Sequence, residues 1–267
     1  LTDGDVRCWG ANGHGQLGDG TTTTSTVPVA VTGIDGAAQV AAGRAHACAL
    51  DADGTVRCWG DNSVGQLGDG TTTDALVPVA VVGLADVVEV TAGEMHTCAR
   101  RGDGTLWCWG SGDLGKLGRG SFDSSPVPVA VTGIDDAISV SAGAEHTCAL
   151  RADGTIACWG DNLIQQLGLG RPTGDDVTTP RPVFAAPDAV ELSVGADSSC
   201  VATDAGEVRC WGDGRTGLLG YGWDGVPLSP LPAGHPTALP ATVIEVAAGG
   251  DASCARLADG TVRCWGT

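Results

Sequence analysis

The chain has 267 residues and a formal net charge of −18 at pH 7, with 14 lysines and arginines against 32 acidic residues. This balance argues against a nucleic acid or an anionic membrane as partner, because binding phosphate groups requires clustered cations. No apolar run approaches the roughly 20 residues that cross a bilayer, so we expect no membrane insertion.

A repeat of about 50 residues runs through the whole chain. Each unit carries a Cys-Trp-Gly tripeptide, and the tryptophans are Trp9, Trp59, Trp109, Trp159, Trp211 and Trp265. Their spacings of 50, 50, 50, 52 and 54 residues are typical of propellers and other repeat arrays. The chain then divides into a partial repeat 1–10 and the repeats 11–60, 61–110, 111–160, 161–212 and 213–267, all within one domain.

Short apolar runs bounded by glycine and aspartate predict the strands of each unit. In the first complete unit, residues 27–34 are entered through Pro28, which suits an edge strand. Residues 40–50 and 55–60 give two further strands. No window shows sustained helical periodicity, so we expect few helices. Several strands per unit with glycine-rich turns predict an all-β propeller with four-stranded blades.

A hairpin joins the last two of these strands. Residues 51–54 read Asp-Ala-Asp-Gly, and we expect a type I turn with Gly54 in the left-handed region. That turn pairs position 50 with 56 and Cys48 with Cys58, on a non-hydrogen-bonded pair that brings the Cα atoms to about 4.5 Å. The register therefore predicts a disulfide across the hairpin.

The same register applies to every complete unit. The five predicted bridges are Cys48–Cys58, Cys98–Cys108, Cys148–Cys158, Cys200–Cys210 and Cys254–Cys264. Two alternatives stay open: small thiols that pack between blades, or a pair of metal ligands, although no second pair is nearby in sequence. Disulfides indicate an extracellular, periplasmic or cell-surface location. Cys8 is the odd cysteine, and its partner would fall three positions before Leu1.

Residues 43–73 resemble a repeat of the regulator-of-chromosome-condensation family. Gly43-x-x-His46, the Asp-Gly hairpin, Trp59-Gly60 and the Gly-Gln-Leu-Gly of residues 65–68 carry the resemblance, which extends over essentially the whole chain. Later repeats depart from it, with Ser198 and Ala252 at the histidine position and Lys116 and Leu218 at the glutamine position.

The resemblance implies a β-propeller, usually of seven blades. Members of the family include a nucleotide-exchange factor for the GTPase Ran, a plant UV-B photoreceptor, ubiquitin-ligase scaffolds and a secreted inhibitor of β-lactamases. Fold alone does not choose among these functions. An acidic, disulfide-bonded chain fits the first role poorly. The chain holds five complete repeats, so we expect about two further repeats before Leu1, or an open arc completed by a neighbour.

Candidate catalytic residues are few. His46, His96 and His146 recur at one repeat position, as structural residues do. The Asp-x-Asp-Gly of residues 51–54 lacks the glutamate of a calcium-binding EF-hand loop. The Gly-Asp-Gly-Thr runs lack the Gly-Lys-Ser of a phosphate loop. We therefore expect no catalytic site, no metal and no cofactor.

An insertion at residues 220–240 breaks the repeat. It carries Tyr221, Trp223 and His235, and aromatic side chains on such a loop are candidates for contact with a partner. A proline-rich loop folded over a blade edge is the equally open alternative. We expect an extracellular, noncatalytic propeller that presents loops to a protein or glycan. The second hypothesis is a structural building block that self-assembles through blade edges.

Overall fold

The computed structural model describes residues 4–170, 176–183, 186–215, 217–220, 239 and 242–267. These residues form twenty strands and one short 3-10 helix, η1 (Asp113–Gly115), in agreement with the expected scarcity of helices. The candidate loop residues Tyr221, Trp223 and His235 lie outside the described residues. None of the helices in the described part of the chain has the length and apolarity of a membrane span.

The strands form six antiparallel sheets. The first sheet pairs β1 (Arg7–Gly10) with β2 (Ser25–Ala30). The second orders β3 (Ala37–Ala42), β4 (His46–Asp51), β5 (Val56–Gly60) and β6 (Ala75–Ala80). The third orders β7 (Val87–Ala92), β8 (His96–Arg101), β9 (Leu106–Gly110) and β10 (Ser125–Ala130).

The remaining sheets continue this order. The fourth contains β11 (Ala137–Ala142), β12 (His146–Arg151), β13 (Ile156–Gly160) and β14 (Val177–Val183). The fifth contains β15 (Ala189–Val194), β16 (Ser198–Thr203) and β17 (Val208–Gly212). The sixth contains β18 (Val243–Ala248), β19 (Ala252–Leu257) and β20 (Val262–Gly266).

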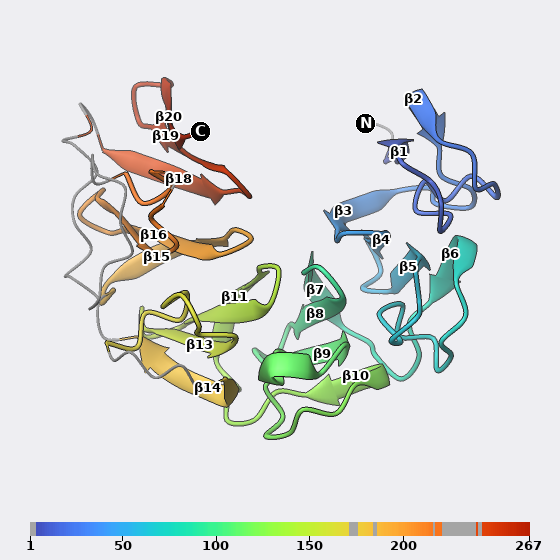
Figure 1. Ribbon diagram of the computed structural model, residues 1–267, viewed down its shortest axis with the longest axis horizontal. Coiled ribbons are helices and arrows are strands. Elements are labelled where there is room, and N and C mark those ends of the chain that lie inside the picture. The colour runs from blue at the N-terminus through green and yellow to red at the C-terminus, as the bar shows by residue number, and fades with distance from the viewer. Residues whose placement is uncertain (1–3, 171–175, 184–185, 216, 221–238, 240–241) are drawn as a thin grey trace.

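The six sheets follow one another around an arc, as the blades of a propeller do, and the blades are numbered in this order (Figure 1). The blue β1–β2 sheet and the red β18–β20 sheet stand at its two ends, and none of the described strands closes the arc between them. Each four-stranded blade takes its outer strand from the next sequence repeat, since β6 follows the Trp59-Gly60 boundary. Prolines such as Pro78 and Pro128 occur in these outer strands, where an absent N–H disturbs no ladder.

The hairpin register is the one that the sequence predicts. Cys48 lies opposite Cys58 and Leu50 opposite Val56. Gly54 has φ +82°, and its N–H donates to the carbonyl of Asp51 at 3.0 Å. All five predicted cysteine pairs form disulfides, with Cα atoms 4.0–4.1 Å apart. The thiol and metal alternatives are therefore not needed for these ten residues.

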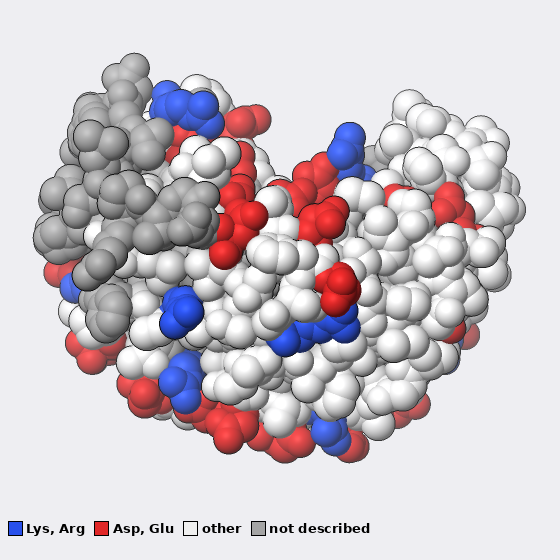
Figure 2. Space-filling view, turned by 60° about the horizontal axis from the view of Figure 1, so that its bottom comes forward, with Lys and Arg blue, Asp and Glu red and all other residues white. Residues whose placement is uncertain are grey.

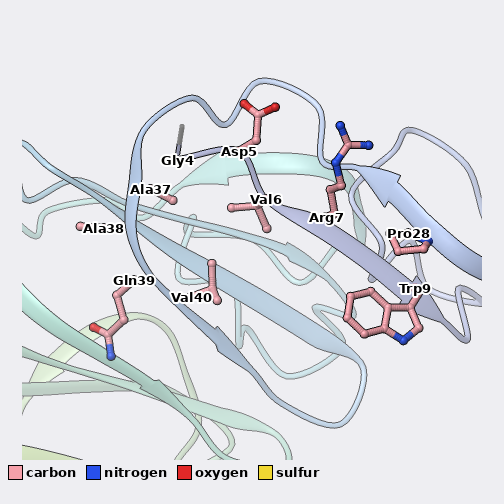
Figure 3. A pocket seen from close by; sticks show the side chains of 10 residues that line it. All are labelled: Gly4, Asp5, Val6, Arg7, Trp9, Pro28, Ala37, Ala38, Gln39 and Val40. Carbon is pink, nitrogen blue, oxygen red and sulfur yellow. The ribbon is translucent and has the colours of Figure 1, made fainter. Parts of the chain in front are cut away.

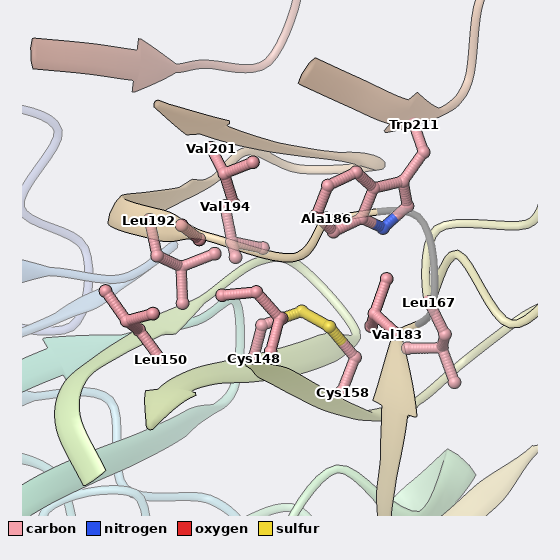
Figure 4. Close-up of a cluster of buried hydrophobic side chains, with 12 residues drawn as sticks. Cys148, Leu150, Cys158, Leu167, Val183, Ala186, Leu192, Val194, Val201 and Trp211 are labelled. Atoms are coloured by element: carbon pink, nitrogen blue, oxygen red, sulfur yellow. A yellow bond between two sulfur atoms is a disulfide. The ribbon is translucent and has the colours of Figure 1, made fainter. Parts of the chain in front are cut away.

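Apolar clusters between adjacent blades form the core. Figure 4 shows one of them, in which the Cys148–Cys158 disulfide and Leu150 of one blade face Leu192 and Trp211 of the next. The indole Nε1 of Trp211 donates to the backbone carbonyl of Gln166, in the preceding blade's loop, at 3.0 Å. The repeated tryptophans therefore hold neighbouring blades together, beyond the packing at the hairpin end that the sequence predicts.

Candidate binding surface around the propeller axis

Short turns from the first to the second strand of each blade gather at the inner side of the arc. These axial turns are residues 43–45, 93–95, 143–145, 195–197 and 249–251. Backbone N–H groups of Arg44, Glu94, Ala144 and Ala196 each donate to the carbonyl of the next turn, at 3.1–3.3 Å. The turns are thereby tied into one continuous rim.

Small residues allow this close approach. A Cβ atom at Gly93 would lie 2.4 Å from the backbone oxygen of Gly143, which real structures do not allow. Alanine and glycine from five blades line an axial pocket of about 480 Å³, with Val194 and two charged residues, Arg44 and Glu94. The pocket therefore presents mainly backbone and methyl groups.

Carboxylates outnumber cations on the axial turns. The turns carry Arg44 against Glu94, Glu145, Asp197 and Asp251. Arg44 pairs with Glu94 at 2.5 Å, and its side chain is 70% exposed. Figure 2 shows acidic residues beside the hollow of the arc and along its lower margin.

Two of these carboxylates differ in their surroundings. Glu145 forms an ion pair with Lys116, whose side chain is buried. Burial raises the pKa of Asp197, and the nearby charges of Asp213 and Asp161 raise it further. The axial surface therefore holds like charges close together, and a bound cationic group would relieve this repulsion.

A buried histidine directly follows each of the first three axial turns and bridges to the next blade. His46 Nε2 lies 2.9 Å from Thr97 Oγ1, whose hydroxyl donates to the backbone oxygen of Gln66. His96 and His146 make the same bridge to Thr147 and Ser199 of the next blade.

Burial lowers the pKa of each of these imidazoles. The pKa of His46 falls to about 4 and that of His146 to about 3. For His96, burial lowers the pKa well below the ordinary value, and the charge of Lys116 lowers it further. Neutral, enclosed rings that join blades have a structural role, as their recurrence in the sequence predicts.

A second pocket lies between the first two blades. It has about 470 Å³ and lies between β1 and β3, lined by Trp9, Pro28, Val40 and neighbouring residues (Figure 3). Trp9 is 64% exposed, whereas Trp109 is fully buried. Cys8, next to Trp9, is a free thiol, and burial raises its pKa.

Sequence reasoning did not single out the axial turns. Its candidates were the residue 220–240 insertion and the cysteines, and the cysteines lie inside the blades. A signal was nonetheless present, because an acidic residue follows the turn glycine by one or two positions in four of the five turns. Only the curvature of the arc brings these turns together.

A family model described as the RCC1-like domain matches residues 1–267. The chain belongs to the RCC1-like domain family. No curated protein matches this RCC1-like chain. Among solved structures, human WBSCR16 is 22% identical with a TM-score of 0.80, over 98% of this chain and 67% of that one.

Two further structures show the same RCC1-like fold. Yeast RCC1 (Prp20), solved with Kap60 bound, is 20% identical with a TM-score of 0.66, over 98% of this chain and 78% of that one. The ectodomain of the Physcomitrella patens receptor kinase CR4 is 22% identical with a TM-score of 0.52, over 86% of this chain and 50% of that one. At these identities the likeness concerns the fold alone.

Proposed function

We propose that this chain is a noncatalytic extracellular binding propeller whose axial surface binds a basic segment of a protein partner. One observation carries the proposal. The axial turns hold four carboxylates against one arginine, and two of them, Glu94 and Glu145, pair with Arg44 and Lys116. Burial raises the pKa of Asp197, and the charges of Asp213 and Asp161 raise it further, although Arg215 lowers it. A lysine- or arginine-rich segment would neutralise this field and would be steered toward it.

The fold comparison supports a protein as the partner. The solved yeast relative is a complex with the protein Kap60. A glycan is the alternative chemistry, but sugars are commonly held by flat aromatic faces, and the axial pocket is lined by alanine, glycine and valine besides its two charged residues. Competition by soluble sugars would favour the glycan instead.

The five disulfides support an extracellular location, because such bonds persist in oxidising compartments. Intact-mass measurement of native material, with and without reductant, tests this part. We expect a gain of two hydrogens for each bridge on reduction. Free thiols in the native material at the ten paired cysteines would remove the reason for the extracellular location.

A charge-matched pair of variants tests the axial surface. Asp197→Asn with Asp251→Asn removes two charges from the axial turns. Asp153→Asn with Asp259→Asn removes two charges from hairpin turns at the opposite ends of the strands, where Asn keeps the oxygen that accepts the N–H of Thr155 or Thr261.

The probe is a lysine- and arginine-rich peptide, and its affinity is measured by titration calorimetry at low and at physiological salt. We expect the double variant in the axial turns to weaken binding of the peptide by about 1 kcal/mol, roughly fivefold. The double variant in the hairpin turns should change the affinity little. Equal losses in both pairs would indicate a response to net charge alone and would contradict the proposal.

The residue 220–240 insertion remains a second candidate contact on the same propeller. We propose that Tyr221, Trp223 and His235 contact the partner, as aromatic side chains on a loop limited by prolines would do. Trp223→Ala should then weaken association by about 2 kcal/mol with little change in melting temperature. A loss of about 3 kcal/mol in stability with affinity intact would identify Trp223 as a cover over a blade.

A structural role is the second candidate function, and one observation favours it. Trp9 of the first blade and Val40 of the second are exposed beside an open pocket, at positions that are buried between blades elsewhere (Figure 3). Such a face would join blades of other copies in an assembly. Sedimentation at increasing concentration distinguishes the two, since a building block should associate and a Trp9→Lys variant should not.

A further inference from the structure

A histidine in the loop after β1 of the first blade lies against two aspartates of the second blade. His14 Nδ1 is 2.9 Å from Asp74 Oδ2 and 3.9 Å from Asp61 Oδ1. One potential ligand atom from each residue lies within 4.8 Å of the other two. Asp61 is buried, whereas His14 and Asp74 are exposed, so the cluster opens to solvent on one side.

The repeat shows which of these side chains the fold requires. The position of His14, two residues before Gln16, is occupied by Val64, Leu114 and Ile164 in the following repeats. An imidazole is therefore not needed for the loop to form. Its presence opposite two carboxylates is a departure from the repeat that packing does not explain.

The position of Asp74 also has a role that needs no carboxylate. Asp74 Oδ1 accepts the N–H of Asn62 at 2.9 Å. In the next blade Ser124 Oγ accepts the N–H of Gly112 at 3.1 Å, so a hydroxyl satisfies the same loop. The second oxygen of Asp74 is left to face His14.

Asp61 is held rigidly in the same cluster. Its Oδ1 accepts the N–H of Ser63 at 3.0 Å, and its Oδ2 accepts from Gln66 Nε2 at 2.8 Å. Each carboxylate oxygen has two lone pairs, so both can still take a further partner. The aspartate is therefore preorganised and keeps ligand capacity toward His14.

We propose that His14, Asp61 and Asp74 form a binding site for a divalent transition-metal cation, with Zn²⁺ as the best match to one imidazole and two carboxylates. Tetrahedral Zn²⁺ with ligands at about 2.0–2.2 Å requires ligand atoms about 3.4 Å apart. His14 Nδ1 is 2.9 Å from the Asp74 oxygen and 3.9 Å from the Asp61 oxygen, so the two distances lie on either side of this value. The side chains of His14 and Asp74 are exposed and can rotate to meet it. Water completes the coordination.

The bound ion would fasten the loop after β1 to the second blade. His14 belongs to that loop, while Asp61 and Asp74 flank the loop between β5 and β6. Because the ion binds the folded arrangement, it should stabilise this junction by mass action. Asp61 adjoins the axial turn 43–45, because its N–H donates to the carbonyl of Ala45 at 2.8 Å. None of the three ligands belongs to the axial turns, so each proposal has its own test.

Titration calorimetry with ZnCl₂ tests the site, on disulfide-intact protein without a histidine tag. The background is Cys8→Ser, which removes a competing thiol ligand. We expect one ion per chain, and both His14→Leu and Asp74→Ser should weaken the affinity at least tenfold. The fold should tolerate His14→Leu, because the junction of the third and fourth blades already has this combination. There Leu114, Asp161 and Asp176 stand at the positions of His14, Asp61 and Asp74.

Thermal melting provides the second readout. Zn²⁺ should raise the melting temperature of the background protein and not that of His14→Leu, while the two should melt alike in chelator. Absence of one-to-one binding, or an affinity that His14→Leu leaves unchanged, would overturn the proposal. Binding of Ca²⁺ in preference to Zn²⁺, insensitive to His14→Leu, would also overturn it.

Discussion

The first blade and the third blade differ in how much of the same sequence pattern they bury. Trp9 of the first blade is 64% exposed, whereas Trp109 of the third blade is fully buried. Val40, on the strand of the second blade that faces the first, is 56% exposed, whereas Val90 at the same position of the third blade is 1% exposed. Cys8 is a free thiol, whereas Cys98 is joined to Cys108. The tryptophans and the valines are alike, and what differs is the blade that packs against them. Stability in this propeller therefore comes from the interfaces between blades, as in other repeat arrays.

The largest expected effect comes from breaking such an interface at a tryptophan. Trp109→Ala removes an indole that is fully buried and donates to the Gln66 backbone oxygen at 3.0 Å. We expect a loss of about 3–5 kcal/mol in the free energy of unfolding. Trp9→Ala is the matched control and should cost less than about 1 kcal/mol. Denaturant titration measures both, and similar losses would contradict the comparison.

The Lys116–Glu145 pair gives the next effect. Glu145→Ala leaves the buried ammonium of Lys116 without its counter-charge, which should cost about 3 kcal/mol. Lys116→Gln restores the residue of other repeats, such as Gln66, and should recover most of this loss in the double variant. If the double variant is no more stable than Glu145→Ala, the pair does not explain the departure of Lys116 from the repeat.

Removing a disulfide should have a slightly smaller effect. Replacing Cys98 and Cys108 together by alanine releases a loop of about 11 residues, worth roughly 2.5–3 kcal/mol. Cys8→Ser should change stability little, because Cys8 is free. Thermal melts of both variants against the parent give the answer. A destabilisation by Cys8→Ser as large as that of the double variant would mean that Cys8 contributes to the core.

Local geometry was predictable from the sequence, and contacts between repeats were not. The Asp-Gly turn fixes the pairing of Cys48 with Cys58, because a hairpin register follows from a few adjacent residues. The bond from Trp109 to Gln66 spans 43 residues and depends on how blades stack. The axial turns and the His14–Asp74 contact, across 60 residues, likewise depend on the curvature of the arc.

The smallest effect is a dependence on pH. The pKa of His46 is about 4 and that of His146 about 3 in the folded state, against about 6.5 in the unfolded chain. The unfolded state therefore binds more protons between these values, and stability falls as the pH drops below about 6.5.

Each buried histidine contributes a slope of up to about 1.4 kcal/mol per pH unit. His96→Ser places in the third blade the residue that the fifth blade has at this position, Ser198. The substitution removes one titrating imidazole, so the slope should fall by up to about 1.4 kcal/mol per pH unit. Denaturant titrations between pH 5 and pH 6, roughly, measure it. An unchanged slope would show that this imidazole does not stay neutral in the folded protein.

Hydrogen exchange with and without the basic peptide reports where on the propeller a partner binds. We expect added protection of the five axial turns, residues 43–45, 93–95, 143–145, 195–197 and 249–251. The hairpin turns 51–55, 101–105 and 151–155 should change little. Protection confined to the hairpin turns, or to the face that carries Trp9, would contradict the axial surface as the binding site.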